Sequence, residues 1–100
     1  MSNNKNTIPL RFENRLFVIK PDFSLVREIE NELGSISTLR ENFLRNGWLV
    51  SDLVTLVQML LQAAGRSVDY LLLGNAMLCE GLMDYLAAVQ VFLDMVLHAE

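Results

Sequence analysis

Apolar and polar residues alternate in two short stretches near the start of the chain. In "IPLRF", residues 8–12, every second residue is apolar, which predicts a β-strand with one buried face. A second extended stretch, "LFVIK", is rich in β-branched and aromatic residues. Together they predict a β-hairpin, with two registers open. A two-residue turn at Glu13-Asn14 would bury Phe17, whereas a three-residue turn would bury Leu16 instead.

Two amphipathic helices are expected after the hairpin. Asp22 suits the start of the first helix, and Gly34 supplies its end. The second helix follows "SIST", with Ser37 or Thr38 as its expected N-cap, and it closes at Asn46-Gly47. Charged residues on the outer side of the first helix are typical of a surface helix.

The rest of the chain is predominantly apolar. Helical spacing of apolar residues predicts a helix from Ser51 to Ala64, with Ser51 as its N-cap. Residues 66–75 are predicted to be a connection with one helical turn near Asp69. Residues 76–100 are predicted to form one long helix. One narrow stripe on that helix holds its ionisable residues: Glu80, Asp84, Asp94 and His98.

These elements predict an α+β fold that is mostly α, with an N-terminal β-hairpin followed by four to five helices. We expect residues 1–6 to be disordered and residues 7–100 to form a single domain. Counting glycine and omitting tyrosine, 55 of the 100 residues are apolar, above the roughly 45–50% of typical soluble domains. The chain therefore carries more apolar surface than one small core uses.

The predicted C-terminal helix is apolar around most of its circumference. A helix that is hydrophobic all round is normally buried all round. We expect the hairpin and the earlier helices to cover two of its flanks. A third flank, around Leu86, Val89 and Leu93, is predicted to remain for another chain, either a second copy in a homo-oligomer or a partner protein.

Charge is distributed unevenly along the chain. The formal net charge is −4, yet residues 1–66 hold all eight Lys and Arg, and residues 67–100 hold five acidic residues and no Lys or Arg. Phosphate binding needs clustered cations, so we expect no nucleic-acid partner. Acidic residues inside the C-terminal helix argue against a membrane span. The single cysteine and the polar N-terminus predict a cytoplasmic protein.

Candidate catalytic residues are few. The only histidine, His98, is far along the chain from the only cysteine, Cys79, and no third group is placed to orient either. Cys79 is interpreted as a small packed hydrophobe. Glu80 and Asp84 are spaced to share a proton or a metal, but no further ligand lies at suitable spacing, which favours a solvated face. We expect no enzymatic activity, no cofactor and no metal.

Trp48 is a further candidate for partner binding. It follows Asn46-Gly47 in a connection between helices. A large ring with a polar N–H at such a position is either a lid on the core or an exposed anchor for a partner. The candidate partner-binding residues are therefore Trp48, Leu86, Val89 and Leu93.

Three segments together resemble a known family. They are the opening hairpin, the run "FSLVREIENELG" that follows it directly, and "LVSDLVTLVQMLLQAAGRSVD". In their order, the chain resembles the phage tail assembly chaperones of the gene transfer agent type, formerly labelled tail tube proteins. The resemblance covers about residues 7–97. It departs at Glu13-Asn14, where the family usually has an Asp-Gly type of turn, and in the final helix, which is bulkier than usual.

This resemblance implies a non-enzymatic assembly factor. Such chaperones bind and shield the aggregation-prone tape-measure protein in the bacterial cytoplasm until tail subunits polymerise around it. The implied partners are the tape-measure protein and tail subunits. Two alternatives stay open: a structural tail component, such as a tube, terminator or connector subunit, and a small acidic protein-binding regulator.

Overall fold

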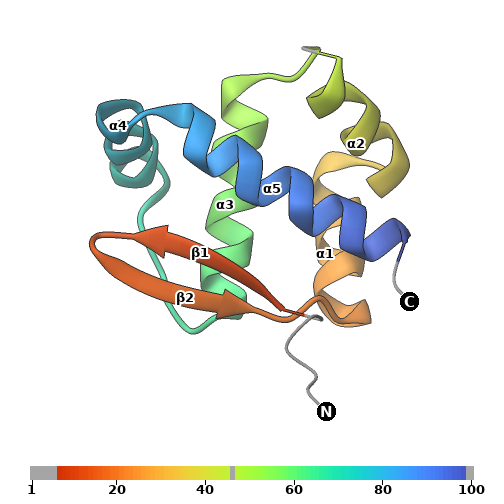
Figure 1. The fold of residues 1–100 in the computed structure, drawn as a ribbon, viewed down its shortest axis with the longest axis horizontal. Helices are drawn as coiled ribbons and strands as arrows, with labels where there is room; N and C mark the ends of the chain where they lie inside the picture. The colour runs from red at the N-terminus through yellow and green to blue at the C-terminus, as the bar shows by residue number, and fades with distance from the viewer. Residues whose placement is uncertain (1–6, 46, 99–100) are drawn as a thin grey trace.

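The fold is a two-stranded hairpin followed by five helices. The computed structural model describes residues 7–45 and 47–98 (Figure 1). The segment expected to be disordered, residues 1–6, lies outside the described residues. The elements are β1 (Ile8–Phe12), β2 (Arg15–Ile19), α1 (Phe23–Leu33), α2 (Ile36–Leu44), α3 (Val50–Ala63), α4 (Tyr70–Glu80) and α5 (Leu82–Leu97). The predicted α+β fold that is mostly α is confirmed.

The hairpin adopts the register of the two-residue turn. Leu10 pairs with Phe17, and Phe17 is buried, whereas Leu16 is 57% exposed. Both turn residues, Glu13 and Asn14, have positive φ angles of 54° and 62°. Two left-handed residues in succession give the backbone twist that suits the flanking strands. One face of the hairpin is therefore apolar and needs a cover, which α3 and α5 provide (Figure 1).

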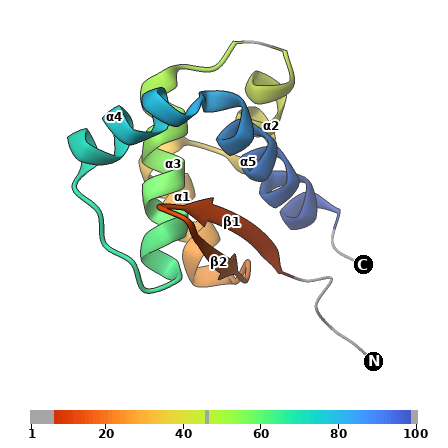
Figure 2. The same ribbon diagram turned by 60° about the vertical axis from the view of Figure 1, so that its left-hand side comes forward.

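Helix α3 occupies the centre of the core. It contacts β2, α1, α4 and α5 (Figures 1 and 2). Helix α2 packs against α5 (Figure 2). The buried side chains of α3 are Leu53, Val54, Leu56, Val57, Leu60 and Leu61.

The start of α1 agrees with the sequence, whereas the start of α2 depends on a contact that spacing alone does not reveal. The Asp22 carboxylate accepts a hydrogen bond from the backbone N–H of Leu25 at 2.9 Å, which confirms Asp22 at the start of α1. The predicted cap of α2 is wrong, because the cap is Ser35, which accepts from the N–H of Thr38 at 3.1 Å. Buried Ile36 begins α2 and its N–H donates to the Glu30 carboxylate at 3.0 Å, which explains the earlier start.

Helix α3 also begins before its expected cap. Its first residue is Val50, and Leu49 occupies the N-cap position without a side-chain hydrogen bond. Ser51 therefore lies in the first turn, and its carbonyl accepts a hydrogen bond from the Tyr70 hydroxyl at 3.1 Å.

The predicted single helix over residues 76–100 is wrong. A helix already begins at Tyr70, where the Asp69 carboxylate accepts from the N–H of Leu72 at 3.1 Å. It ends at Glu80, and Gly81, with a φ of 105°, separates it from α5. The two helices are bent by 110° relative to each other. Helix α4, through Met77, and helix α5 both pack into the core. The bend allows the two helices to do so with different axis directions.

Substitution of Gly81 tests the break. A Cβ added at Gly81 would have no heavy atom within 4 Å, so Gly81→Ala acts through its positive φ and should lower the free energy of unfolding by about 1–3 kcal/mol. In a continuous helix the same change would raise it by about 1 kcal/mol. Urea unfolding of the parent and the variant shows whether the free energy of unfolding falls or rises.

Gly74→Ala is the matched control for this test. Gly74 lies inside α4, and its added Cβ would meet the Val54 methyl groups at ordinary contact distances of 3.7 and 3.8 Å. We expect this variant to be stabilised by about 0.5–1 kcal/mol. Stabilisation by Gly81→Ala as well would contradict the break.

Candidate partner-binding surface

The flank expected to be left for another chain is covered within the protein. Val89 and Leu93 are completely buried and Leu86 is 6% exposed. The hairpin strand β1, α2 and α3 all pack against α5 and enclose these side chains. The prediction that they form an uncovered flank is therefore wrong, because the C-terminal helix has more neighbours than its sequence indicates.

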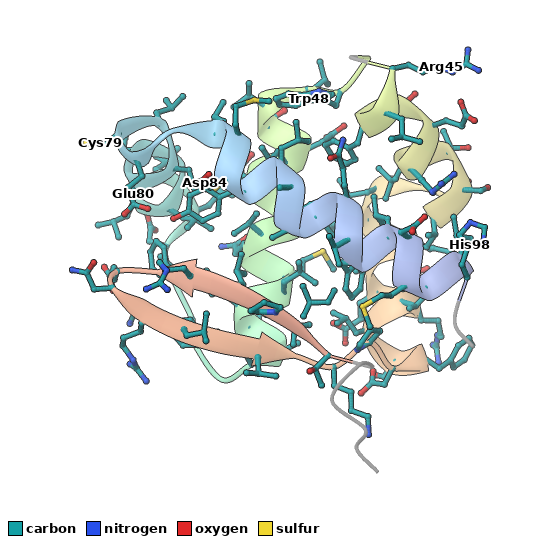
Figure 3. All side chains as sticks on the ribbon, viewed as in Figure 1. Arg45, Trp48, Cys79, Glu80, Asp84 and His98 are labelled. Atoms are coloured by element: carbon teal, nitrogen blue, oxygen red, sulfur yellow. The ribbon has the colours of Figure 1, made fainter. Side chains whose placement is uncertain are left out.

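Trp48 occupies an intermediate position. It is half-buried and packs against the core, with its ring centroid 5.9 Å from that of Phe43 and the two planes inclined by 34°. It lies at the α2–α3 end of the molecule (Figure 3). The contact with buried Phe43 favours the interpretation of Trp48 as a lid on the core.

An uncovered apolar surface lies instead on α4. Its inner side packs on the core through Leu73 and Met77, which are completely buried. Its outer side is formed by residues that recur at helical spacing, and we call it the α4 face: Leu71, Leu72, Asn75, Leu78 and Cys79. The three leucines are 72%, 55% and 59% exposed, respectively. Helix α4 is thus the helix that is apolar nearly all round, and only its inner side is covered.

Cys79 belongs to this exposed surface. Its interpretation as a packed hydrophobe is wrong, because its side chain is exposed and lies at the outer edge of the molecule (Figure 3). The apolar sequence around it indicates burial, but the position of Cys79 on the helix directs it away from α3.

Sequence reasoning misses the α4 face because it assigns residues 66–75 to a connection. Two signals in the sequence point to the helix. Asp69 is a favourable N-cap residue, and the ten residues after it, "YLLLGNAMLC", contain no charge and no proline. Gly81 then supplies a stop.

The acidic residues do not form one stripe in water. Asp94 accepts from Arg40 of α2 with an N–O distance of 3.0 Å, and His98 lies 3.8 Å from the same oxygen. Glu80 lies on the other side of the break and accepts a hydrogen bond from the Tyr85 hydroxyl at 2.6 Å. Among residues 7–45 and 47–98 no group of three or more potential ligands is placed to hold a metal ion.

Tyr85 connects the break to the core. Its side chain is almost completely buried. Burial, then the hydrogen bond to Glu80 and its negative charge, raise the pKa of the Tyr85 hydroxyl well above its ordinary value of 10.0. The neutral hydroxyl therefore holds α4 and α5 together at the bend.

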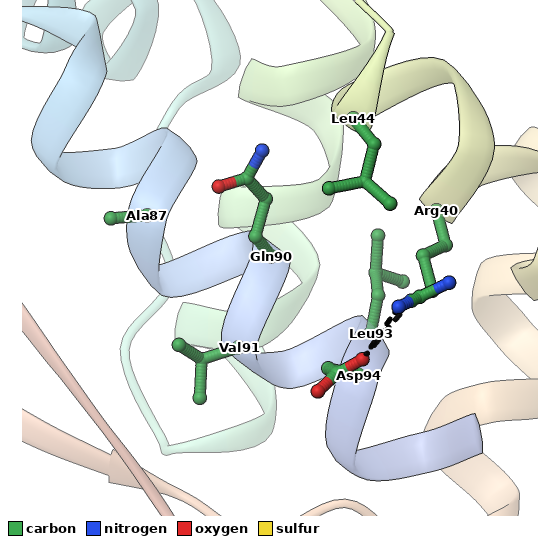
Figure 4. A pocket seen from close by; sticks show the side chains of 7 residues that line it. All are labelled: Arg40, Leu44, Ala87, Gln90, Val91, Leu93 and Asp94. Atoms are coloured by element: carbon green, nitrogen blue, oxygen red, sulfur yellow. Dashed lines mark hydrogen bonds and ion pairs between the residues drawn. The ribbon is translucent and has the colours of Figure 1, made fainter. Parts of the chain in front are cut away.

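A groove of about 400 Å³ runs between α2 and α5 (Figure 4). Its apolar lining includes Leu44 and Val91, both about half exposed. The Arg40–Asp94 ion pair lies in the groove, and the Gln90 amide donates to the Phe43 carbonyl at 3.1 Å. These polar contacts attach α2 to α5, so we interpret the groove as part of the helix–helix contact.

Within the described part of the chain, no single helix is long and apolar enough to cross a membrane. Helices α4 and α5 meet those criteria only as a pair, and that pair is sharply bent.

Comparison with known proteins identifies the family. Residues 5–99 match the model of a family described as phage tail tube protein, GTA-gp10. The chain belongs to this family. No curated protein and no solved structure matches it. The protein is therefore related to the tails of phages or gene transfer agents.

Substitution of Tyr85 tests the contact at the bend of this tail-family protein. Tyr85→Phe keeps the ring and removes the hydrogen bond to Glu80, so at neutral pH the free energy of unfolding should fall by about 1 kcal/mol. The raised pKa of Tyr85 implies that its stabilising contribution is full below pH 10 and is lost as the pH rises further. The difference between parent and variant in urea unfolding should therefore shrink above pH 10, and parallel curves would contradict this assignment.

Proposed function

We propose that this protein is a tail assembly chaperone that binds an apolar helical segment of the tape-measure protein through the α4 face. The observation that carries the proposal is the exposure of Leu71, Leu72 and Leu78 on one side of a single helix. A partner helix packed there would remove this surface from water, with a gain of roughly 25 cal/mol per Å² of apolar area. Clustered apolar exposure on a small protein is typical of an interaction site.

The charges around the α4 face fit a partner that is held by apolar contacts. Residues 70–79 carry no charge, and the residues from 67 onwards carry only acidic ones, apart from His98. Charge repulsion between chaperone molecules would keep the loaded protein dispersed, since net charge away from zero favours solubility. We further propose that the protein acts in the cytoplasm of the bacterial host and has no enzymatic activity.

A structural tail component is an equally consistent second candidate, because membership of the family indicates a tail-related protein without separating the two roles. In that case, the α4 face would be buried against a neighbouring subunit of the finished tail. The two candidates differ in the final location of the protein.

The first test locates the protein in purified particles. Particles from the phage or gene transfer agent that encodes the chain would be analysed by quantitative mass spectrometry. A chaperone should be present in lysates during assembly and absent from particles. A fixed number of copies per particle would overturn the chaperone proposal in favour of the structural one.

The second test concerns the binding surface. Leu71→Glu should weaken capture of the co-expressed tape-measure protein at least about tenfold, because the new carboxylate would lose its hydration in the contact. Leu16→Glu, on the outer side of the hairpin, is the matched control, since Leu16 is also more than half exposed.

Salt dependence provides a separate measurement on the parent protein. Affinity for the tape-measure protein should change little between low and high salt, because salt screens charge pairs and not apolar contacts. Collapse of binding at high salt would show that the apolar α4 face is not the binding site. In the substitution test, equal weakening by Leu71→Glu and Leu16→Glu would show the same.

A further inference from the structure

The α4 face is symmetric in its order of residues. Asn75 is at its centre, Leu72 and Leu78 lie three residues to either side, and Leu71 and Cys79 lie four residues to either side. All five side chains are exposed. A twofold axis through Asn75, perpendicular to the helix, would place Leu72 opposite Leu78 of a second copy. The same axis would place Leu71 opposite Cys79 of that copy.

We propose that the free protein forms a homodimer in which two α4 faces pack antiparallel, with Asn75 at the twofold axis. In such a dimer each copy uses the same surface, which must therefore be complementary to itself. The inference builds on the proposed function, because it assigns the occupant of the same face before the tape-measure protein arrives.

The chemistry of Asn75 fits this position. Its primary amide carries both a donor and an acceptor, so two copies across a twofold axis can hydrogen-bond each other reciprocally. One asparagine in an apolar seam between helices fixes register and orientation at a cost in stability. The amide of Asn75 is thus satisfied by its own symmetry mate.

Charge and placement also favour a second copy as the occupant. The face carries no charge, so its self-contact brings no like charges together within the seam. Antiparallel helices also align their macrodipoles favourably. Helix α4 lies at one side of the molecule, and its inner side is held by α3, which leaves the outer side open to a second helix (Figures 1 and 2).

The size of the contact predicts a reversible dimer. One crossing of two short helices belongs to the small class of interfaces, below about 1,200 Å². Such a dimer dissociates readily, which allows a tape-measure segment to replace the second copy on the same leucines. Dimerisation would then protect the apolar face until the partner is made.

Sedimentation equilibrium of the full chain alone tests the pairing. The parent should be a dimer at high concentration and dissociate on dilution. Leu72→Glu and Leu78→Lys, each alone, should raise the dimer dissociation constant at least about tenfold. The double variant should regain dimerisation, because the antiparallel register brings the new carboxylate of one copy against the new ammonium group of the other. Leu16→Glu is the control that should remain dimeric.

Disulfide formation under a mild oxidant tests the register independently and needs no charged substitution. Leu71→Cys should give a covalent dimer through the native Cys79 of the second copy. The parent should not, because the two native cysteines of an antiparallel pair lie roughly 12 Å apart along the helix, beyond the reach of a disulfide.

The outcomes separate the inference from the proposed function. A parent that is monomeric up to millimolar concentration, an unaffected Leu72→Glu dimer, or rapid cross-linking of the parent through Cys79 would each overturn the antiparallel dimer. Tape-measure capture by such a monomer would leave the proposed function intact. An antiparallel dimer that never captures the tape-measure protein would support the inference and overturn the function.

Discussion

Burial of α3 is the constraint on which the rest of the structure depends. Six of its fourteen residues are buried, and they do not lie in one narrow line along the helix. One neighbour cannot cover such a helix, and β2, α1, α4 and α5 contact it together. The arrangement of these elements, including the bend after α4, follows from the need to remove this one helix from water.

Local sequence predicts the elements whose pattern is set by immediate neighbours. The alternation in β1, the acceptance of positive φ by Asn14 and the cap at Asp22 all act over a few residues. The bend at Gly81 could not be predicted in this way. A glycine inside an apolar run is compatible with a continuous helix, and the choice is made by distant contacts of Met77 and Tyr85 with the core.

The location of the α4 face could be predicted even less well from the sequence. Periodicity identifies which residues share a side of a helix, but in a helix that is apolar nearly all round it does not say which side is covered. Val89 and Leu78 are both apolar, yet Val89 is completely buried and Leu78 is 59% exposed. Only the three-dimensional arrangement separates them. The surplus of apolar residues is visible from composition, whereas its location on α4 is not.

The contact between β1 and α5 has a consequence for the order of folding. These two elements are separated by most of the chain, and α5 covers the apolar face of a hairpin that is synthesised first. A two-stranded hairpin is at best marginally stable alone in water. Closing so long a loop is entropically costly and slow relative to local helix formation. During translation α3 can cover the β2 side of the hairpin first, whereas the β1 side stays unprotected until α5 has emerged and the core can close.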